Sequence, residues 1–495
     1  MYRKLGSVLT GQAFLPFDLE NQMKLLPLLL VLVLVVGCSQ SVTKAFDENA
    51  IENNLIPAIE FGGALMNDMT VQSRMEHYGV SAFSVSVIND GQIVWTKAYG
   101  TYLRGGERPI SINTKFQAAS LSKAITALGV MKLVDEEKIE LFAPVNQYLQ
   151  SWKLPQSKFA TRPTTVNSLL SHTAGVSTPS FSGYEANADL PNINQILDGL
   201  PPANSSAVEV SITPGEYNYS GGGYMVLQKI IEDISGKSFE EYMQGTLFAP
   251  LGISQTSFDV IMPNDKADDI APGMSWSGHT YDEGWWIYPE QAAAGLWSTP
   301  NDLAVILNSY IAAYQGNENQ LFSQDTAHLM SKEIDQKMGL GFGVHDSGKA
   351  KHMDHAGWTR GYRSYMVVFP ETGDGAVLMA NGNGSHRLIQ EMTRSIAKEF
   401  NWPAFKSQKL TRADWTLEQL NELAGNYWMN PAGFVISLTV KDDHLILSTP
   451  RGTSYTVYPI GENEIVIIED GLRIPVNRKE GISLSMWGMQ AVREE

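Results

Sequence analysis

A serine and a lysine three residues apart, Ser120 and Lys123, are the pair in this chain best suited to chemistry. Apolar residues follow them at helical spacing, so we expect both side chains on one face of a helix, near its start. A serine hydroxyl is a poor nucleophile at neutral pH, and a partly buried amine beside it can help to remove its proton. Unpaired N–H groups in the first helical turn would favour developing negative charge. The pair therefore predicts nucleophilic catalysis by Ser120.

Four-residue patterns recur by chance, so the alternative is a helix that carries a surface serine and a surface lysine. Two later segments favour the catalytic interpretation. In the first, Tyr219 lies between a Pro-Gly turn and a run of glycines, which is typical of a loop tip rather than of a core aromatic. In the second, His355 precedes Ala356, Gly357 and Trp358, and a strand-like run follows.

In this order and at this separation, the three segments resemble the serine β-lactamase and penicillin-binding-protein superfamily, most of all its class C-like branch. That branch also contains esterases and D-amino-acid peptidases. Residues 169–175, 294–303 and 339–343 look like further signatures of the same family. The resemblance extends from near Ala82 to near Phe400. It implies a serine nucleophile and a mixed α and β fold, in which helices flank an antiparallel sheet and form a helical subdomain.

The resemblance also implies roles for the matching side chains. Ser120 would attack a carbonyl carbon, and Lys123 would lower the barrier to removing its proton. Tyr219 would act as a phenolate or as a proton relay. A phenol ordinarily titrates near pH ~10, so it is a useful base only beside cations or donors, and Lys123 and His355 are the candidates here.

An oxyanion hole is implied as well, made by the backbone N–H groups of Ser120 and Trp358. Two such donors typically stabilise a transition state by a few kcal/mol each. Gly357 fits a strand edge that a substrate backbone must approach closely.

Two departures from the family pattern bear on the substrate. Many relatives have Tyr-x-Asn, whose amide contacts the substrate, whereas this chain has Tyr219-Ser220-Gly221, so that Gly221 opens space beside the base. Many relatives have Lys-Thr-Gly on the strand, whereas this chain has His355, which is mostly neutral at pH 7. Both changes favour the esterase and peptidase members over β-lactamases. They leave weak acylation by lactams open.

Aromatic residues crowd the region before the 294–303 segment. Intervening Gly, Pro and Asp residues suggest a loop, so we expect Trp285 and Trp286 to line the cleft and to favour an apolar or aromatic acyl group. The alternative is that these side chains build a second core. The aromatic set is Trp276, Tyr281, Trp285, Trp286, Tyr288 and Trp297.

The other histidines carry weaker signals. His172 lies in a Ser-His-Thr turn, where we expect a packing and hydrogen-bonding role. His352 and His355 could be metal ligands, but they lack the helical geometry of metalloprotease motifs and no third ligand stands out. The sequence predicts neither a metal site nor a cofactor.

Composition excludes some functions and suggests an export route. The net charge of −17 argues against nucleic acid, and a single cysteine excludes an intrachain disulfide. Met23 and Lys24 precede an apolar run over residues 25–36 that is too short to span a bilayer comfortably. Val35-Val36-Gly37-Cys38 resembles a bacterial lipobox, so Cys38 would be the lipidated first residue of the mature protein; the alternative is an ordinary signal peptide.

The length suits two domains, and the pattern divides the chain further. We expect an upstream extension or misassigned start over residues 1–22, a lipoprotein signal over 23–37 and a tether over 38–56. The hydrolase domain would cover 57–402, and a small antiparallel β-sheet or barrel would cover 403–495. Its expected roles are packing, capping the cleft or contacting a partner.

Local signals predict the main elements of the hydrolase domain. A helix is expected over residues 53–79, followed by a hairpin with strands over 82–88 and 93–99. A second hairpin has strands over 365–369 and 376–380, and a helix over 390–400 would follow. Strands at both ends suggest one sheet assembled from distant parts of the domain.

The sequence thus predicts a lipid-anchored, periplasm-facing serine hydrolase of the bacterial cell envelope, in either membrane. It would cleave a small ester, amide or peptide through an acyl-enzyme on Ser120, with weak lactam hydrolysis. The enzymatic alternatives are a D-Ala-type peptidase and a β-lactamase. The non-enzymatic alternative is a penicillin-binding-like receptor that is acylated without turnover.

Overall fold

The computed structural model describes residues 46–494, except 63–67, 264–268, 277, 283, 320, 347, 349–350, 451 and 480. Cys38 and the expected signal and tether up to residue 45 lie outside the described residues. No helix in the described part of the chain combines the length and hydropathy that a membrane span requires.

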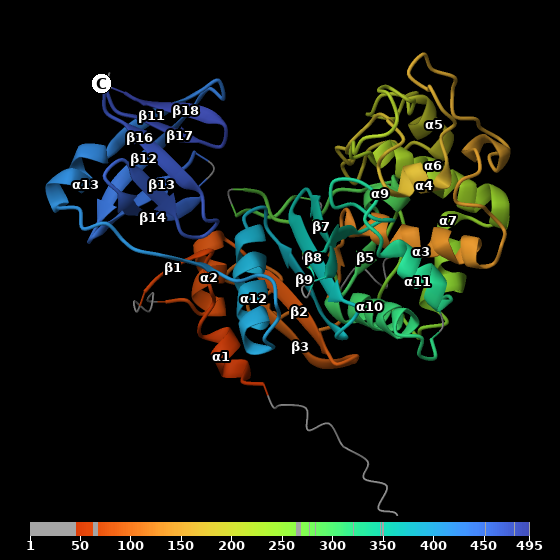
Figure 1. Cartoon of the computed structure of the whole chain (residues 1–495), viewed down its shortest axis with the longest axis horizontal. Helices are drawn as coiled ribbons and strands as arrows, with labels where there is room; N and C mark the ends of the chain where they lie inside the picture. Colours follow the sequence, from red (N-terminus) through yellow and green to blue (C-terminus); the bar gives the residue numbers. More distant parts are fainter. Residues whose placement is uncertain are drawn as a thin grey trace, which may run out of the picture. The chain divides into compact units, whose positions relative to one another are not determined.

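Helices and strands alternate irregularly through the first 400 residues (Figure 1). The helices are α1 (Glu48–Glu52), α2 (Val71–Tyr78), α3 (Leu121–Asp135), η1 (Val145–Gln147), α4 (Val166–Leu170), α5 (Ile193–Asp198), α6 (Gly221–Ser235), α7 (Phe239–Met243), η2 (Gln244–Phe248), α9 (Gln291–Ala294), α10 (Pro300–Tyr314), α11 (Gln324–Met330) and α12 (His386–Glu399). The strands are β1 (Ile59–Phe61), β2 (Ala82–Asn89), β3 (Gln92–Gly100), β4 (Phe116–Gln117), β5 (Trp297–Ser298), β6 (Gly343–His345), β7 (His352–Thr359), β8 (Tyr362–Phe369) and β9 (Asp374–Asn381).

The main sheet joins both ends of this domain, as predicted. Its six antiparallel strands have the order β3-β2-β9-β8-β7-β6, so the early hairpin β2–β3 lies beside the late hairpin β8–β9. Both predicted hairpins are confirmed. Pairing of Phe83 with Ala380 shows how closely residues from the two ends of the domain approach.

Alternating side chains of the sheet supply two separate cores. Phe83, Val85 and Val87 pack with apolar residues of α1, α2 and α12. Ala82 and Ile88 point the other way and join the core that contains α3, α6 and α10. Side chains alternate along a strand, so both faces of this sheet carry apolar residues. Helices cover both faces and bury these residues.

Helix α3 is the centre of the second core. Its residues from Leu121 to Met131 are all buried, including the polar Ser122 and Lys123. A helix that is apolar nearly all round lies inside a domain rather than on its surface. The helix therefore holds its first turn in a fixed position.

The C-terminal strands form a closed antiparallel barrel, drawn in blue in Figure 1. Alternate residues, such as Tyr427, Ile436 and Leu447, fill its interior, and Leu420 and Leu423 of α13 join the same core. The elements from residue 408 on are β10 (Gln408–Leu410), α13 (Leu417–Leu423), β11 (Gly425–Asn430), β12 (Phe434–Lys441), β13 (His444–Ser448), β14 (Ser454–Gly461), β15 (Glu464–Ile467), β16 (Arg473–Asn477), β17 (Ser483–Met486) and β18 (Met489–Arg493). The predicted fold class, with its small C-terminal β domain, is confirmed.

The helix expected over residues 53–79 is wrong. Among the described residues of this segment only α2, at its end, is helical; it ends at Tyr78, and Gly79 follows with the left-handed φ of 67° that is typical of a helix end. Earlier in the segment, Pro57 lacks the N–H that a helix interior needs. Residues 59–61 form β1, which pairs in parallel with β10, so a distant strand decides the conformation here.

Candidate active site

Ser120 begins helix α3, and its hydroxyl is not used to cap that helix. It occupies the N-cap position in helical conformation without a capping hydrogen bond from its side chain. The preceding residue, Ala119, is fully buried and has a φ of 54°, in the left-handed region that disfavours residues other than glycine. Such strain persists only where the surroundings impose it, and it is concentrated at functional sites.

Leu296, just before β5, and Ser364 of β8 help to hold this strained turn in place. The Ala118 N–H donates to the Leu296 carbonyl at 2.8 Å, and the Ser364 hydroxyl donates to the Ala118 carbonyl at 2.6 Å. The Ser122 hydroxyl donates to the Ala119 carbonyl at 2.5 Å and accepts from the Leu296 N–H at 3.0 Å. The 294–303 segment, through the hydrogen bonds of Leu296, therefore fixes the position of the Ser120 turn.

Lys123 reaches Ser120 from one turn further along α3. Its amine lies 3.3 Å from the Ser120 Oγ and donates to the Ala293 carbonyl at 2.8 Å. The residue is 2% exposed, and no carboxylate of the described chain forms an ion pair with it. The amine is thus held by one neutral oxygen and directed at the hydroxyl.

Tyr219 lies against the same amine. The Lys123 Nζ is 4.9 Å from the centre of the Tyr219 ring. The next residue, Ser220, is the N-cap of α6: its hydroxyl accepts from the Gly223 N–H at 2.9 Å and donates to the Ser177 carbonyl at 2.8 Å. Ser220 is 3% exposed, so its hydroxyl does not replace the substrate-contacting amide of the family pattern.

His355 is a neutral group in this structure rather than a second cation. Burial, with the nearby Lys123, lowers the pKa of His355 to about 4. Its Nδ1 lies 2.8 Å from the Ala356 carbonyl, which can only accept, so Nδ1 carries the proton. The lone pair is therefore on Nε2, and any role of His355 towards Tyr219 would be that of an acceptor.

Strand β7 presents a free edge beside the nucleophile. Its partner β6 pairs only as far as Gly343 with Asp354, so residues 355–359 have no strand partner on that side within the described chain. A Cβ on Gly357 would lie 2.1 Å from the Ser364 Oγ and 2.4 Å from the Ala118 carbonyl oxygen. Only glycine permits this approach of β7 to the Ser120 turn.

The Trp358 indole lies on the opposite face of β7 from Gly357. It is 64% exposed and is packed on the Arg363 guanidinium, 4.0 Å from the ring centre. An oxyanion role for this residue therefore concerns its backbone N–H alone, and together with that of Ser120 it stays a prediction.

The predicted substrate-binding residues occupy different settings. Trp285 packs edge-on against Trp297 at 5.5 Å, while Trp286 lies under the Arg360 guanidinium at 3.9 Å. Tyr288 and Trp297 are buried, so part of the aromatic set does build a core. Gly221 is buried, and a Cβ added there would lie 2.9 Å from the Phe181 ring. Contact of Gly221, Trp285 and Trp286 with substrate remains a prediction.

Two features of the site have no sequence signal. Lys123 donates to the backbone carbonyl of Ala293. Every residue has such a carbonyl, so the sequence does not identify this partner. The left-handed conformation of Ala119 cannot be predicted from the sequence either, since alanine carries no preference for that region.

A metal site at His352 and His355 is not favoured by their positions. They are three residues apart on one strand and so point to opposite faces, which separates their side chains. The described residues contain no group of three or more His, Cys, Asp and Glu side chains arranged to hold a metal.

Glu290 precedes helix α9 and is fully buried, and neither carboxyl oxygen has a hydrogen-bond partner in the described structure. Burial raises its pKa from 4.5 to about 8. The folded protein therefore keeps this proton up to about pH 8, whereas the unfolded chain releases it near pH 4.5. Between these values the folded state binds more protons, so this group makes stability fall as pH rises.

We expect Glu290→Gln to remove that pH dependence. The wild type should lose stability relative to the variant from pH 5 to pH 8, by at most about 1.4 kcal/mol per pH unit. Chemical denaturation at several pH values measures the difference. Parallel stability profiles for the two proteins would contradict the assignment.

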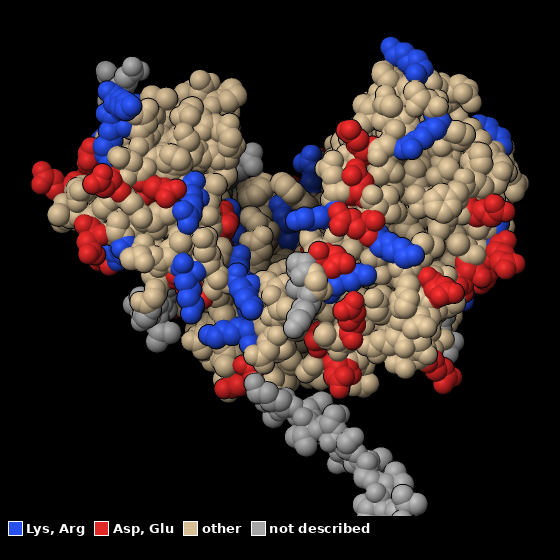
Figure 2. Space-filling view, in the orientation of Figure 1, with Lys and Arg blue, Asp and Glu red and all other residues tan. Residues whose placement is uncertain are grey.

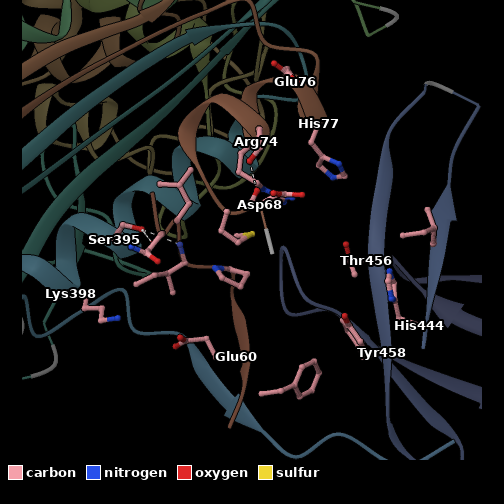
Figure 3. Close-up of a pocket in the computed structure, with 18 of the residues that line it drawn as sticks. Glu60, Asp68, Arg74, Glu76, His77, Ser395, Lys398, His444, Thr456 and Tyr458 are labelled. Atoms are coloured by element: carbon pink, nitrogen blue, oxygen red, sulfur yellow. Dashed lines mark hydrogen bonds between the residues drawn. The ribbon is translucent and has the colours of Figure 1, made fainter. Parts of the chain in front are cut away.

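A cavity of about 1070 Å³ lies elsewhere, between the α2 and α12 side and strands β13 and β14 (Figure 3). Charged residues such as Arg74, Lys398 and Glu60 face His444 and Tyr458 across it, and none of the candidate catalytic residues lines it. The candidate site is therefore defined by α3 and β7, not by this cavity.

The surface charges are mixed. On the molecular face in Figure 2, Lys and Arg lie among Asp and Glu side chains.

Comparisons with known proteins identify the family and the fold of this chain. Protein flp from Staphylococcus aureus (strain MRSA252) is 23% identical over 342 residues, which are 66% of this chain and 65% of that protein. The chain thus spans about two thirds of the length of that curated relative.

Two solved structures share the fold. The octameric penicillin-binding protein homologue from Pyrococcus abyssi has a TM-score of 0.60 at 22% identity, covering 86% of this chain and 100% of that one. The D-amino acid amidase from Ochrobactrum anthropi SV3, complexed with L-phenylalanine, has a TM-score of 0.54 at 21% identity, covering 71% and 98%. Residues 67–399 match the family described as Beta-lactamase. That match runs through every segment that carries the candidate site, from α3 to β7, and the chain belongs to the beta-lactamase family.

Proposed function

We propose that this chain is a serine hydrolase of the class C-like branch, which cleaves an ester or amide through an acyl-enzyme on Ser120. One observation carries the proposal. The Ser120 hydroxyl makes no capping bond and lies 3.3 Å from the buried Lys123 amine. A hydroxyl at a helix start would ordinarily cap the helix, so its availability favours a nucleophile.

The proposed steps use groups already described. The Ser120 Oγ bonds to the substrate carbonyl carbon while its proton passes to the Lys123 and Tyr219 pair. The carbonyl electrons move to oxygen, which the N–H groups of Ser120 and Trp358 would stabilise. The carbon–leaving-group bond then breaks, and the leaving group takes the proton. Water repeats the sequence on the acyl-enzyme and releases the acid.

Two features favour ester or amide substrates over β-lactams. The Ser220 hydroxyl is committed to capping α6, so it does not replace the family's substrate-contacting amide. In many relatives the lysine of Lys-Thr-Gly binds a substrate carboxylate. His355 stands at that position and is neutral, so it does not supply the positive charge. Similarity in fold to a D-amino acid amidase supports amides of amino acids as one substrate class.

A side-by-side assay tests the proposal. The substrates are a nitrophenyl ester, D- and L-phenylalanine amide, and a chromogenic cephalosporin. We expect turnover of the ester or an amide, and little turnover of the cephalosporin. Strong cephalosporin turnover would instead assign β-lactamase activity. A stable mass adduct without product release would favour a receptor.

We also propose that the protein is anchored by lipid on Cys38 and faces the periplasm. The support is the lipobox-like Val35-Val36-Gly37-Cys38 sequence after an apolar run. Mass spectrometry of membrane-extracted protein should find a diacylated Cys38 at the mature N-terminus. Any other N-terminus would contradict the anchor.

A further inference from the structure

Two backbone N–H groups around Tyr219 donate to the same residue, His172, in the turn after α4. The Asn218 N–H donates to the His172 carbonyl at 2.7 Å, and the Ser220 N–H donates to the His172 Nδ1 at 3.0 Å. These two N–H groups belong to the residues on either side of Tyr219. The two bonds therefore hold the 217–218 and 219–220 peptides in place, with the tyrosine between them.

The imidazole also packs on the tyrosine itself. The ring centres of His172 and Tyr219 are 4.5 Å apart, and the rings are tilted by 39°. Tyr224 of α6 packs at 5.2 Å and Tyr217 at 6.0 Å, so the histidine lies within a cluster of three tyrosines. The side chain is 1% exposed, and this contact restricts the Tyr219 ring in the way that core packing does.

The protonation state of His172 follows from these contacts. Burial, with the nearby Lys123 and His355, holds the pKa of His172 well below its usual range. Because Nδ1 accepts a hydrogen bond, the neutral ring carries its proton on Nε2, which has no partner among the described residues. The charged and titratable groups around the ring are Lys123 on α3, His355 on β7, and the three tyrosines.

We propose that His172 is a positioning residue that sets the place of Tyr219 beside the Lys123 amine. The proposal rests on the proposed function, since it assigns Tyr219 a part in proton transfer. His172 itself has a φ of 58°, in the left-handed region, and in this conformation its side chain contacts the Tyr219 loop. A packing role alone would require neither the Nδ1 bond nor this conformation.

Matched variants separate positioning from packing. His172→Asn places Oδ1 near the position of Nδ1, keeps an acceptor for the Ser220 N–H and tolerates the left-handed conformation. His172→Gln places its amide near the position of Nε2 and leaves that N–H without its partner. Ser171→Ala is the control, because Ser171 bonds Asn167 and Thr173 in the same turn and does not contact Tyr219.

The readouts are kcat and KM for the nitrophenyl ester across pH 5–9, and the rate at which a fluorophosphonate labels Ser120. We expect His172→Gln to lower kcat and labelling by about 100-fold, with KM little changed, and to shift the acid limb of the profile. His172→Asn should stay within about tenfold of the wild type, and Ser171→Ala should match it. Equal losses in the Asn and Gln variants, or none in either, would overturn the proposal.

A further measurement needs neither activity nor a variant that folds. Long-range ¹H–¹⁵N spectra of the wild-type imidazoles should show His172 neutral at pH 7, with its proton on Nε2. A protonated Nδ1 would overturn the proposal, because it could not accept from Ser220. If Ser120→Ala is labelled and turns over substrate like the wild type, the proposed function fails instead, whatever the tautomer.

Discussion

Ser120→Ala is expected to abolish hydrolysis, lowering kcat by on the order of 10⁴–10⁶-fold. The variant loses the atom that would bond to the substrate carbon, while the backbone N–H groups and the cleft remain. Residual reaction would come from those groups alone. Steady-state hydrolysis of the nitrophenyl ester, on protein free of contaminating esterase, measures the loss.

The same substitution should leave the fold intact, which makes the result interpretable. Replacing an N-cap serine by alanine usually costs about 1 kcal/mol because a capping bond is lost. Here the Ser120 hydroxyl makes no such bond, so Ser120→Ala should melt within a few degrees of the wild type. Substrate turnover that survives in a folded variant would eliminate the acyl-enzyme mechanism.

The sequence predicts the central sheet well because its strands carry their own signals. Alternating apolar residues around Asp90-Gly91 predict the first hairpin, and the structure pairs Asn89 with Gln92 at its turn. The helix that the sequence predicts over residues 53–79, before the sheet, does not form as a whole. There β1 forms because residues 59–61 pair with β10, about 350 positions later, and no local pattern reports such a partner.

The candidate site shows the same division. Ser120, Lys123, Tyr219 and His355 are recognisable because each motif is local, and the structure brings these segments together around the start of α3. What could not be predicted is how they are held. Two of these contacts join segments far apart in sequence: the hydrogen bond from Lys123 to the Ala293 carbonyl, and the pair of hydrogen bonds from the Tyr219 loop to His172. Their existence depends on packing, which a motif does not encode.

Lys123→Met is expected to lower kcat by about 10³-fold while keeping the protein folded. Methionine retains much of the apolar stem but removes the amine that lies 3.3 Å from the Ser120 Oγ. Lys123→Arg is the matched variant: it keeps a positive charge, but its rigid guanidinium fork does not reproduce the position of a single ammonium nitrogen. We expect it to be impaired nearly as much.

Stability separates loss of chemistry from loss of structure. Lys123 is a buried amine without an ion-pair partner in the described chain, and burying such a group is unfavourable unless its hydrogen bonds compensate. Its removal leaves the Ala293 carbonyl without the donor it has at 2.8 Å, at a cost of about 1–3 kcal/mol. Because these effects oppose each other, Lys123→Met should melt near the wild type, or above it, while turnover falls. An inactive variant with a much lower melting temperature would show that Lys123 maintains the fold instead, and an active one would remove the amine from the proton-transfer step.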